Sequence, residues 1–244
     1  MSLRTKLFSI ATVGALAVLM AGPASAGAIT WSFAGGSSPG DGTDGNVRTF
    51  AGTGGVNAYA SGYSTGGSGN SFLKGYVGWF SPGLGVTDTA EGSGGNGAHT
   101  VDNNNRINFI VFEFAQAVAI DTIMLTSYGD ADISVWVGNK AAGNDFTGSE
   151  TFANNLGGLT SLGDFTCSSS CNSDGEVVSY GINGGDIFGN YLIVAAKIGD
   201  SNDEFKIKSI SGDKSTSVPE PMALSLLGLG LAGLGVAARR RRSA

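Results

Sequence analysis

Glycine is the feature that most limits how this chain can fold, since it supplies 41 of the 244 residues. Between Gly35 and Gly97 about one residue in three is glycine, and each one disfavours a helix by roughly 1 kcal/mol relative to alanine. Glycine does not recur in register at every third position, which excludes a collagen helix. We therefore expect irregular loops between Gly35 and Gly97, with short strands at residues 47–51 and 72–79.

Short runs rich in Ile, Val and Phe, separated by polar breaks, occupy the rest of the chain's body. Residues 29–33 alternate apolar and polar side chains, which is typical of a half-buried strand. Further predicted strands cover residues 107–114, 117–126, 133–137, 176–180, 191–198 and 204–210. A short helical segment is expected at residues 150–156. The pattern predicts an all-β fold, a single jelly-roll-like β-sandwich of about eight to ten strands with Gly-rich loops.

The N-terminal segment, residues 1–26, has a basic start, an apolar stretch and the small-residue pattern Ala24-Ser25-Ala26. This order is typical of a secretory signal peptide and predicts a mature chain that begins at Gly27. The alternative is an uncleaved membrane anchor. Pro23 disfavours that alternative, because proline interrupts a helix directly before the cleavage pattern.

The C-terminal segment, residues 217–244, contains a breaker, an apolar span and a basic tail. Pro219-Glu220-Pro221 cannot lie inside a helix, because each proline lacks an amide hydrogen and restricts the residue before it. Residues 222–238 are uncharged and would form a helix of about 25 Å, close to a hydrocarbon core of about 30 Å. Arg239-Arg240-Arg241-Arg242 would then stop translocation and stay on the cytoplasmic side.

Together these C-terminal features resemble the PEP-CTERM sorting signal of exported bacterial proteins. The resemblance implies that an exosortase, a membrane transpeptidase, cuts near Pro219-Glu220-Pro221. It also implies a precursor held in the inner membrane by its C-terminal helix and a destination at the cell surface or extracellular matrix of a Gram-negative bacterium. The implied partners are the secretion machinery, the exosortase and exopolysaccharide. An ordinary C-terminal membrane anchor is the alternative.

The exported body, residues 27–216, contains 8 Lys and Arg residues and 19 Asp and Glu residues, a net charge of −11. This balance argues against nucleic acid, which requires basic patches, and favours solubility. Its two cysteines, Cys167 and Cys171, are predicted to form a local disulfide in an oxidising compartment. A zinc site is disfavoured, because the chain has one histidine and no second cysteine pair.

A polar group of His99, Asp102 and Asn103 precedes the strand predicted at residues 107–114. An imidazole near a carboxylate is typical of an acid–base pair, which would suit a hydrolase. The same residues also suit a hydrogen-bonded corner or a ligand site. We assign no catalytic residue and expect a non-enzymatic protein.

Oxygen-rich loops recur along the body, which allows for a structural calcium ion and no other cofactor. They contain Asp41 and Asp44, residues 102–105, Asp130 and Asp132, and residues 200–204. Asp200-x-Asn202-x-Glu204 has the alternating spacing that begins a calcium loop. Asp and Asn also favour turns without any ion, so both interpretations stay open.

Aromatic side chains offer a second binding chemistry, because sugars stack on exposed rings, although aromatic residues in strands more often belong to a core. The candidates are Tyr59, Tyr63, Trp79, Tyr128 and Trp136. Trp136 is expected on the face opposite Ile133 and Val135, and therefore exposed. The predicted function is a structural protein of the surface or exopolysaccharide. The alternative is a carbohydrate-binding module with an aromatic or calcium-assisted glycan site.

Overall fold

The computed structural model describes residues 27–66, 71–91, 99–147, 150–167, 171, 173–184 and 186–214. Residues 26–216 form one compact unit. The predicted signal peptide and the predicted membrane helix of the C-terminal segment lie outside the described residues. Among the residues that are described, no helix has both the length and the apolar character needed to cross a membrane.

Strands make up nearly all of the regular structure in the described ranges, which confirms the all-β prediction. They are β1 (Ala28–Ser32), β2 (Val47–Ala51), β3 (Asn57–Thr65), β4 (Phe72–Phe80), β5 (Gly83–Thr87), β6 (Val101–Asp102), β7 (Asn108–Ser127), β8 (Ile133–Gly138), β9 (Thr160–Phe165), β10 (Val177–Gly181), β11 (Gly189–Ala196) and β12 (Glu204–Lys214). One 3₁₀ helix, η1 (Phe152–Gly157), lies between β8 and β9. It coincides closely with the helical segment expected at residues 150–156.

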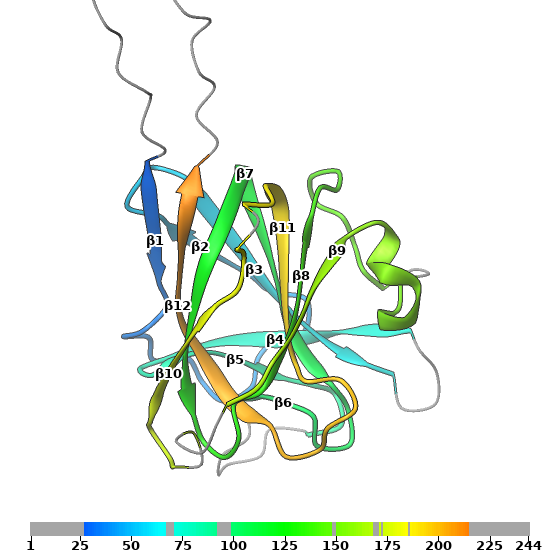
Figure 1. Ribbon diagram of the computed structural model, residues 1–244. Helices are drawn as coiled ribbons and strands as arrows, with labels where there is room; N and C mark the ends of the chain where they lie inside the picture. The colour runs from blue at the N-terminus through cyan, green and yellow to red at the C-terminus, as the bar shows by residue number, and fades with distance from the viewer. Residues whose placement is uncertain are drawn as a thin grey trace, which may run out of the picture. The chain divides into compact units, whose positions relative to one another are not determined.

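The long strand β7 belongs to both layers of the sandwich. Its first half pairs with β3 and β11, and its second half pairs with β12 and β10. One layer thus contains β2, β3, β11, β8 and β9, and the other contains β1, β12 and β10. β4 and β5 run across the lower end in Figure 1 and link β3 to β12. The two runs predicted at residues 107–114 and 117–126 are therefore one strand.

The strands predicted at residues 47–51 and 72–79 are present as β2 and β4, but β3 and β5 lie where irregular loops were expected between Gly35 and Gly97. Gly62 of β3 is paired directly with Gly75 of β4. An added Cβ at Gly85 in β5 would lie only 1.6 Å from the carbonyl oxygen of His99. These glycines allow neighbouring backbones to approach closely, a role that composition alone does not distinguish from that of a turn glycine.

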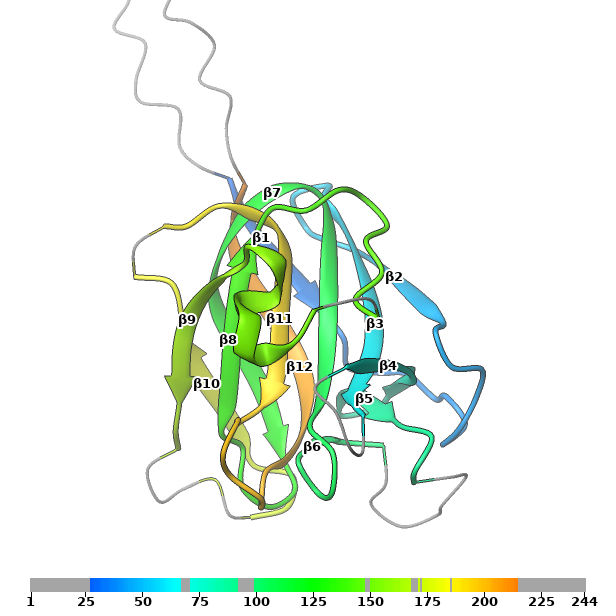
Figure 2. The ribbon, with the colours of Figure 1, turned by 90° about the vertical axis from the view of Figure 1, so that its right-hand side faces the viewer.

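The main core fills the space between the layers, and alternate residues of β7, such as Ile110 and Phe112, point into it. The intervening residues, such as Phe109 and Val111, point to the opposite face and form a second apolar cluster. Figure 2 shows the short helical segment lying over β8 and β11 on that face. The layer that contains β11 is therefore buried on both sides.

Trp136 faces away from the main core, as its alternation predicts, but the expectation that it is exposed was wrong. Its side chain retains only 5% of its accessible surface. The ring of Phe152 from η1 stacks on it, with the centroids 5.1 Å apart. A segment distant in the sequence therefore covers this face.

The disulfide predicted between Cys167 and Cys171 is present, with the Cα atoms 6.1 Å apart. Cys171 is buried in the main core, and its carbonyl oxygen accepts a hydrogen bond from the Ser127 hydroxyl at the end of β7. The disulfide closes a small loop before β10, and the hydrogen bond from Ser127 ties that loop to the end of β7.

Candidate functional site

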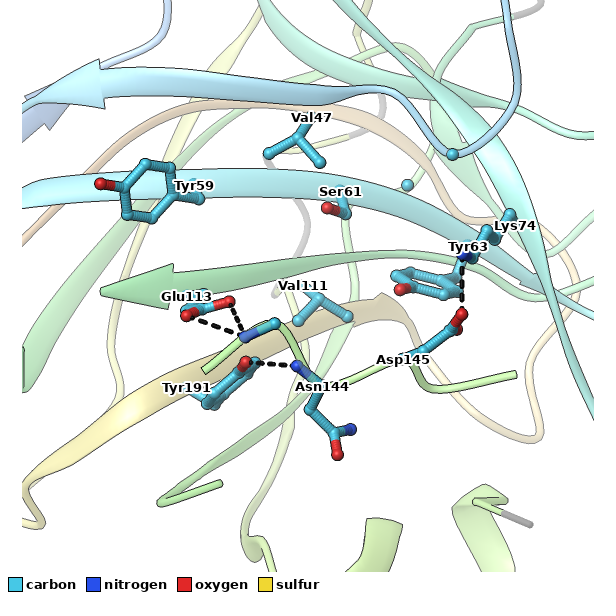
Figure 3. A pocket seen from close by; sticks show the side chains of 13 residues that line it. Val47, Tyr59, Ser61, Tyr63, Lys74, Val111, Glu113, Asn144, Asp145 and Tyr191 are labelled. Carbon is cyan, nitrogen blue, oxygen red and sulfur yellow. Dashed lines mark hydrogen bonds and ion pairs between the residues drawn. The ribbon is translucent and has the colours of Figure 1, made fainter. Parts of the chain in front are cut away.

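The outer face of β3 and β7 carries a polar, aromatic hollow (Figure 3). Tyr59, Ser61 and Tyr63 alternate along β3 and point to the same side. In the sheet register Tyr59 lies opposite Glu113 of β7, and Glu113 lies opposite Tyr191 of β11. Two phenol rings and a carboxylate thus form a row across three strands.

The segment after β8 forms one wall of this hollow. The amide of Gly143 donates to both carboxylate oxygens of Glu113, at 3.2 and 3.0 Å. The amide of Asn144 donates to the Tyr191 hydroxyl at 3.0 Å, and that hydroxyl donates to Ala141 O at 2.9 Å. These bonds fix both the wall and the Glu113 carboxylate before any ligand arrives.

An exposed ion pair stands at the rim, with Lys74 Nζ 2.7 Å from Asp145 Oδ2. The cavity behind it measures about 190 Å³. A more open hollow of about 680 Å³ shares Tyr59 and Glu113 with it. We call the two hollows together the Tyr59 groove; Tyr59 lies where they meet.

The groove combines phenol rings that are neutral at physiological pH with a few oriented polar groups. Burial raises the pKa of both Tyr63 and Tyr191 to about 12. Tyr63 and Tyr191 retain only 5% and 1% of their accessible surface, so the half-buried Tyr59 supplies the accessible ring. That ring, together with the Glu113 carboxylate and nearby hydroxyl groups, suits a ligand that has apolar C–H faces and many hydroxyl groups, as a sugar has. The open second hollow suits a ligand longer than a single ring.

Of the five aromatic candidates, Tyr59 and Tyr63 line the groove, whereas the other three lie elsewhere. Trp79 packs edge-on against Phe50 at 5.6 Å, and Tyr128 lies under the Lys206 ammonium group at 4.9 Å. Sequence reasoning missed Glu113, Tyr191 and Asp145. The alternation of Tyr59, Ser61 and Tyr63 indicates a strand with these three side chains on one face, but Gly62 within the same segment made a turn equally plausible from the sequence.

The polar group of His99, Asp102 and Asn103 is close together in the sequence, but its side chains contact different partners. His99 Nδ1 lies 2.6 Å from the Thr87 hydroxyl, and its ring stacks on Phe80 at 5.7 Å. The Asp102 carboxylate accepts from the amide of Asn104 at 2.9 Å. His99 and Asp102 therefore have different partners, and the partner of Asp102 lies in its own loop. This separation suits a hydrogen-bonded corner.

Asn103 holds two loops together through a pair of reciprocal bonds. Its Nδ2 donates to Asp203 Oδ2 at 2.5 Å, and its Oδ1 accepts from the Asp203 amide at 3.0 Å. Asn103 also donates to Lys197 O at 3.2 Å. The loop before β7 is thereby joined to the loop before β12.

Asp102 also lines an acidic cavity of about 620 Å³ together with Asp88, Glu91, Asp203 and Glu204. Burial raises the pKa of Glu91 to about 7, and the nearby Asp102 and Asp88 carboxylates contribute in the same direction. Burial also raises the pKa of Asp102. The two acids therefore favour a shared proton over two negative charges.

The residues suggested for calcium, Asp200, Asn202 and Glu204, do not form one ligand set. Asp200 Oδ2 contacts Lys197 Nζ at 3.2 Å, and the Asn202 amide group donates to Asp130 at 3.3 Å. Glu204 Oε1 lies 3.5 Å from the Thr100 hydroxyl. It is Asp203, between them, that joins other carboxylates in a cluster.

Residues 36–40 have the sequence Gly-Ser-Ser-Pro-Gly, which matches the hydrolase nucleophile motif G-x-S-x-G. That motif requires a strand-to-helix turn. Here the Ser38 hydroxyl accepts from the Trp79 amide at 3.0 Å, and the next regular element in the described chain is the strand β2. The nucleophile geometry is therefore missing at Ser38.

Comparison with family models decides the nature of the C-terminal segment. The model described as the PEP-CTERM protein-sorting motif matches residues 217–242, which include Pro219-Glu220-Pro221 and the arginine tail. The chain carries a PEP-CTERM sorting signal. This confirms the resemblance found in the sequence. A PEP-CTERM motif implies an exported precursor, anchored in the membrane and processed by an exosortase.

The body gives less information in these comparisons. Comparison with curated proteins gives no match. Among solved structures, discoidin II of Dictyostelium discoideum matches with a TM-score of 0.32 and 10% sequence identity. The match covers 51% of this chain and 43% of the discoidin chain.

Proposed function

We propose that this chain is a non-enzymatic surface protein of a Gram-negative bacterium, sorted by an exosortase to the cell surface or its exopolysaccharide. The PEP-CTERM motif at residues 217–242 carries the proposal. The geometry of the body supports it, because His99 and Asp102 have separate structural partners and Ser38 lacks the setting of a nucleophile. The acidic body suits an extracellular, soluble location.

We expect the mature protein in its native host to begin at Gly27 and to end near Pro219-Glu220-Pro221. Intact-mass measurement and sequencing of the C-terminal peptide test this directly. Deletion of the exosortase gene is the control and should leave residues 222–244 attached. A mature chain that retains those residues in the presence of the exosortase would contradict exosortase processing.

The Tyr59 groove favours a second function for the same body, which is the binding of a polysaccharide chain. Its support is the row formed by Tyr59, Glu113 and Tyr191, with Glu113 held in place by the Gly143 amide. Such a row presents a ring face beside a fixed acceptor, as sugar recognition requires. Binding to exopolysaccharide would retain the sorted protein in the matrix.

Replacing Tyr59 with alanine should weaken retention of the body on the host's exopolysaccharide at least about tenfold, which corresponds to about 1.4 kcal/mol. The side chain is only half-buried, so the fold should persist. Affinity electrophoresis in gels that contain the polysaccharide measures the effect. Tyr128→Ala is the matched control, since Tyr128 lies outside the groove. Equal mobility of Tyr59→Ala and the unaltered body would exclude the groove as the binding site.

A further inference from the structure

A compact carboxylate cluster lies at the end of the sandwich where β12 begins. Asp130 and Asp132 come from the connection between β7 and β8, and Asp203 directly precedes β12. One carboxylate oxygen from each lies within 4.8 Å of the other two. Asp132 and Asp203 are almost fully buried, at 4% and 2% exposure.

The backbone holds these two segments side by side. Asp130 and Asp203 form a parallel β-bridge. The amide of Glu204 donates to Asp130 O at 2.7 Å, and the amide of Asp130 donates to Asn202 O at 3.3 Å. The cluster is therefore built into the main chain rather than formed by mobile surface side chains.

The Asp203 carboxylate has an unmet bonding requirement. Its Oδ2 accepts from the amide of Lys197 at 2.8 Å and from Asn103 at 2.5 Å. Its Oδ1 is buried and has no hydrogen-bond partner among the described residues. A buried carboxylate oxygen without a donor is costly unless a cation compensates it.

Lys197 compensates only part of the negative charge. Its Nζ lies 2.9 Å from Asp132 Oδ2 and 3.2 Å from Asp200 Oδ2. This ammonium group is thus shared by Asp132 and Asp200, and no ion pair joins it to Asp130 or Asp203 among the described residues.

We infer that Asp130, Asp132 and Asp203 hold a calcium ion. The donors are all oxygen atoms, which suits a hard cation. They all lie within 4.8 Å of one another, so one ion with calcium–oxygen bonds of about 2.4 Å can contact all three. Calcium also accepts irregular geometry and completes its shell with carbonyl oxygens and water. Zinc prefers Cys or His ligands, and both cysteines are in the disulfide.

The ion would join several loops at this end of the body. Asp132 Oδ1 accepts from the amide of Cys167 at 2.6 Å, which links the site to the disulfide. Asp203 links it through Asn103 to the loop before β7. Calcium would therefore stabilise the body against unfolding and would have no catalytic task.

The test uses the body, residues 27–216, which lies within a single compact unit that contains both apolar clusters. Calcium at about a hundredfold over its dissociation constant should raise Tm by about 5–10 °C relative to excess EDTA. Titration calorimetry with CaCl₂ should show one site per chain. An unchanged Tm together with no binding heat would overturn the inference. Equal stabilisation by MgCl₂ would overturn the choice of calcium.

Asp203→Asn separates calcium binding from mere folding. Its amide nitrogen can take the place of the unpartnered Oδ1 and donate to a neighbouring carboxylate. In EDTA this variant should therefore melt at or above the Tm of the unaltered body, yet it should lose the calcium response. Asp130→Asn, at a half-exposed position, is a second variant and should also lose the response. Retention of the full response in both variants would overturn the site.

Asp102→Asn is the matched control, because Asp102 lines the neighbouring acidic cavity and lies outside the cluster. It should keep the calcium response. Asp203 lines the cavity as well as belonging to the cluster, whereas Asp130 belongs to the cluster alone. Loss of the response in Asp102→Asn, with retention in Asp130→Asn, would therefore place the ion in the cavity and contradict the assignment.

Discussion

Gly85→Ala is expected to leave the body unable to fold stably. An added Cβ would lie 1.6 Å from the carbonyl oxygen of His99 and 2.6 Å from its carbonyl carbon. The segment cannot withdraw easily, because the Val86 amide donates to Thr100 O at 3.3 Å and Lys206 Nζ donates to His99 O at 2.9 Å. The cost should exceed the roughly 1–3 kcal/mol of ordinary overpacking and approach the few kcal/mol that hold a domain folded. Urea unfolding followed by tryptophan fluorescence measures it.

Gly181→Ala is the matched control, since Gly181 also lies in a strand but is exposed. Nothing lies within 4 Å of the Cβ that it would gain. Its effect on the free energy of unfolding should stay within about 1 kcal/mol. If both variants unfolded at the same urea concentration, the close approach of β5 to the His99 segment would be incorrect.

Trp31→Ala should lower the free energy of unfolding by about 3–5 kcal/mol. Trp31 is fully buried, and its ring packs on Phe114 with the centroids 5.0 Å apart. Its Nε1 donates to Val56 O at 2.8 Å, so truncation leaves both a cavity and a buried carbonyl without its donor. Thermal and urea unfolding of residues 27–216 measure the loss.

Trp31→Phe separates the two contributions, because it keeps an aromatic ring in the core and removes the hydrogen bond to Val56. Its loss should be roughly 1–2 kcal/mol, clearly smaller than that of the alanine variant. Equal losses for the two variants would show that the hydrogen bond, and not the buried ring, fixes β1 in place.

Most strands after residue 101 were predictable because runs rich in Ile, Val and Phe are separated there by short polar breaks, although the polar strand β9 was missed. Strand β8, predicted at residues 133–137 and observed at Ile133–Gly138, is one example. Strands β3 and β5 were missed, because the sequence alone does not distinguish strand glycines such as Gly62 and Gly85 from turn glycines. Their strand conformation depends on partners elsewhere in the chain, which the local sequence does not specify.

The candidate sites also differ in whether their residues are contiguous in the sequence or are brought together only by folding. The PEP-CTERM motif is contiguous, so the sequence identifies it completely. The Tyr59 groove takes its walls from β3, β7, β11 and the segment after β8, which meet only in the folded sheet. The carboxylate cluster pairs Asp130 with Asp203, which are distant in sequence and are joined by a backbone bridge.

The sequence by itself therefore determined the destination of this protein, its β class and its disulfide, because a sorting signal, a residue period and a pair of nearby cysteines are all local properties. The tertiary structure alone decided which faces are covered and which side chains converge. Trp136 is buried because Phe152 folds back over it. Asp203, rather than Asp200 or Glu204, joins Asp130 and Asp132 because of how β12 enters the sheet. Both outcomes depend on contacts between distant segments, which form only when the two layers pack.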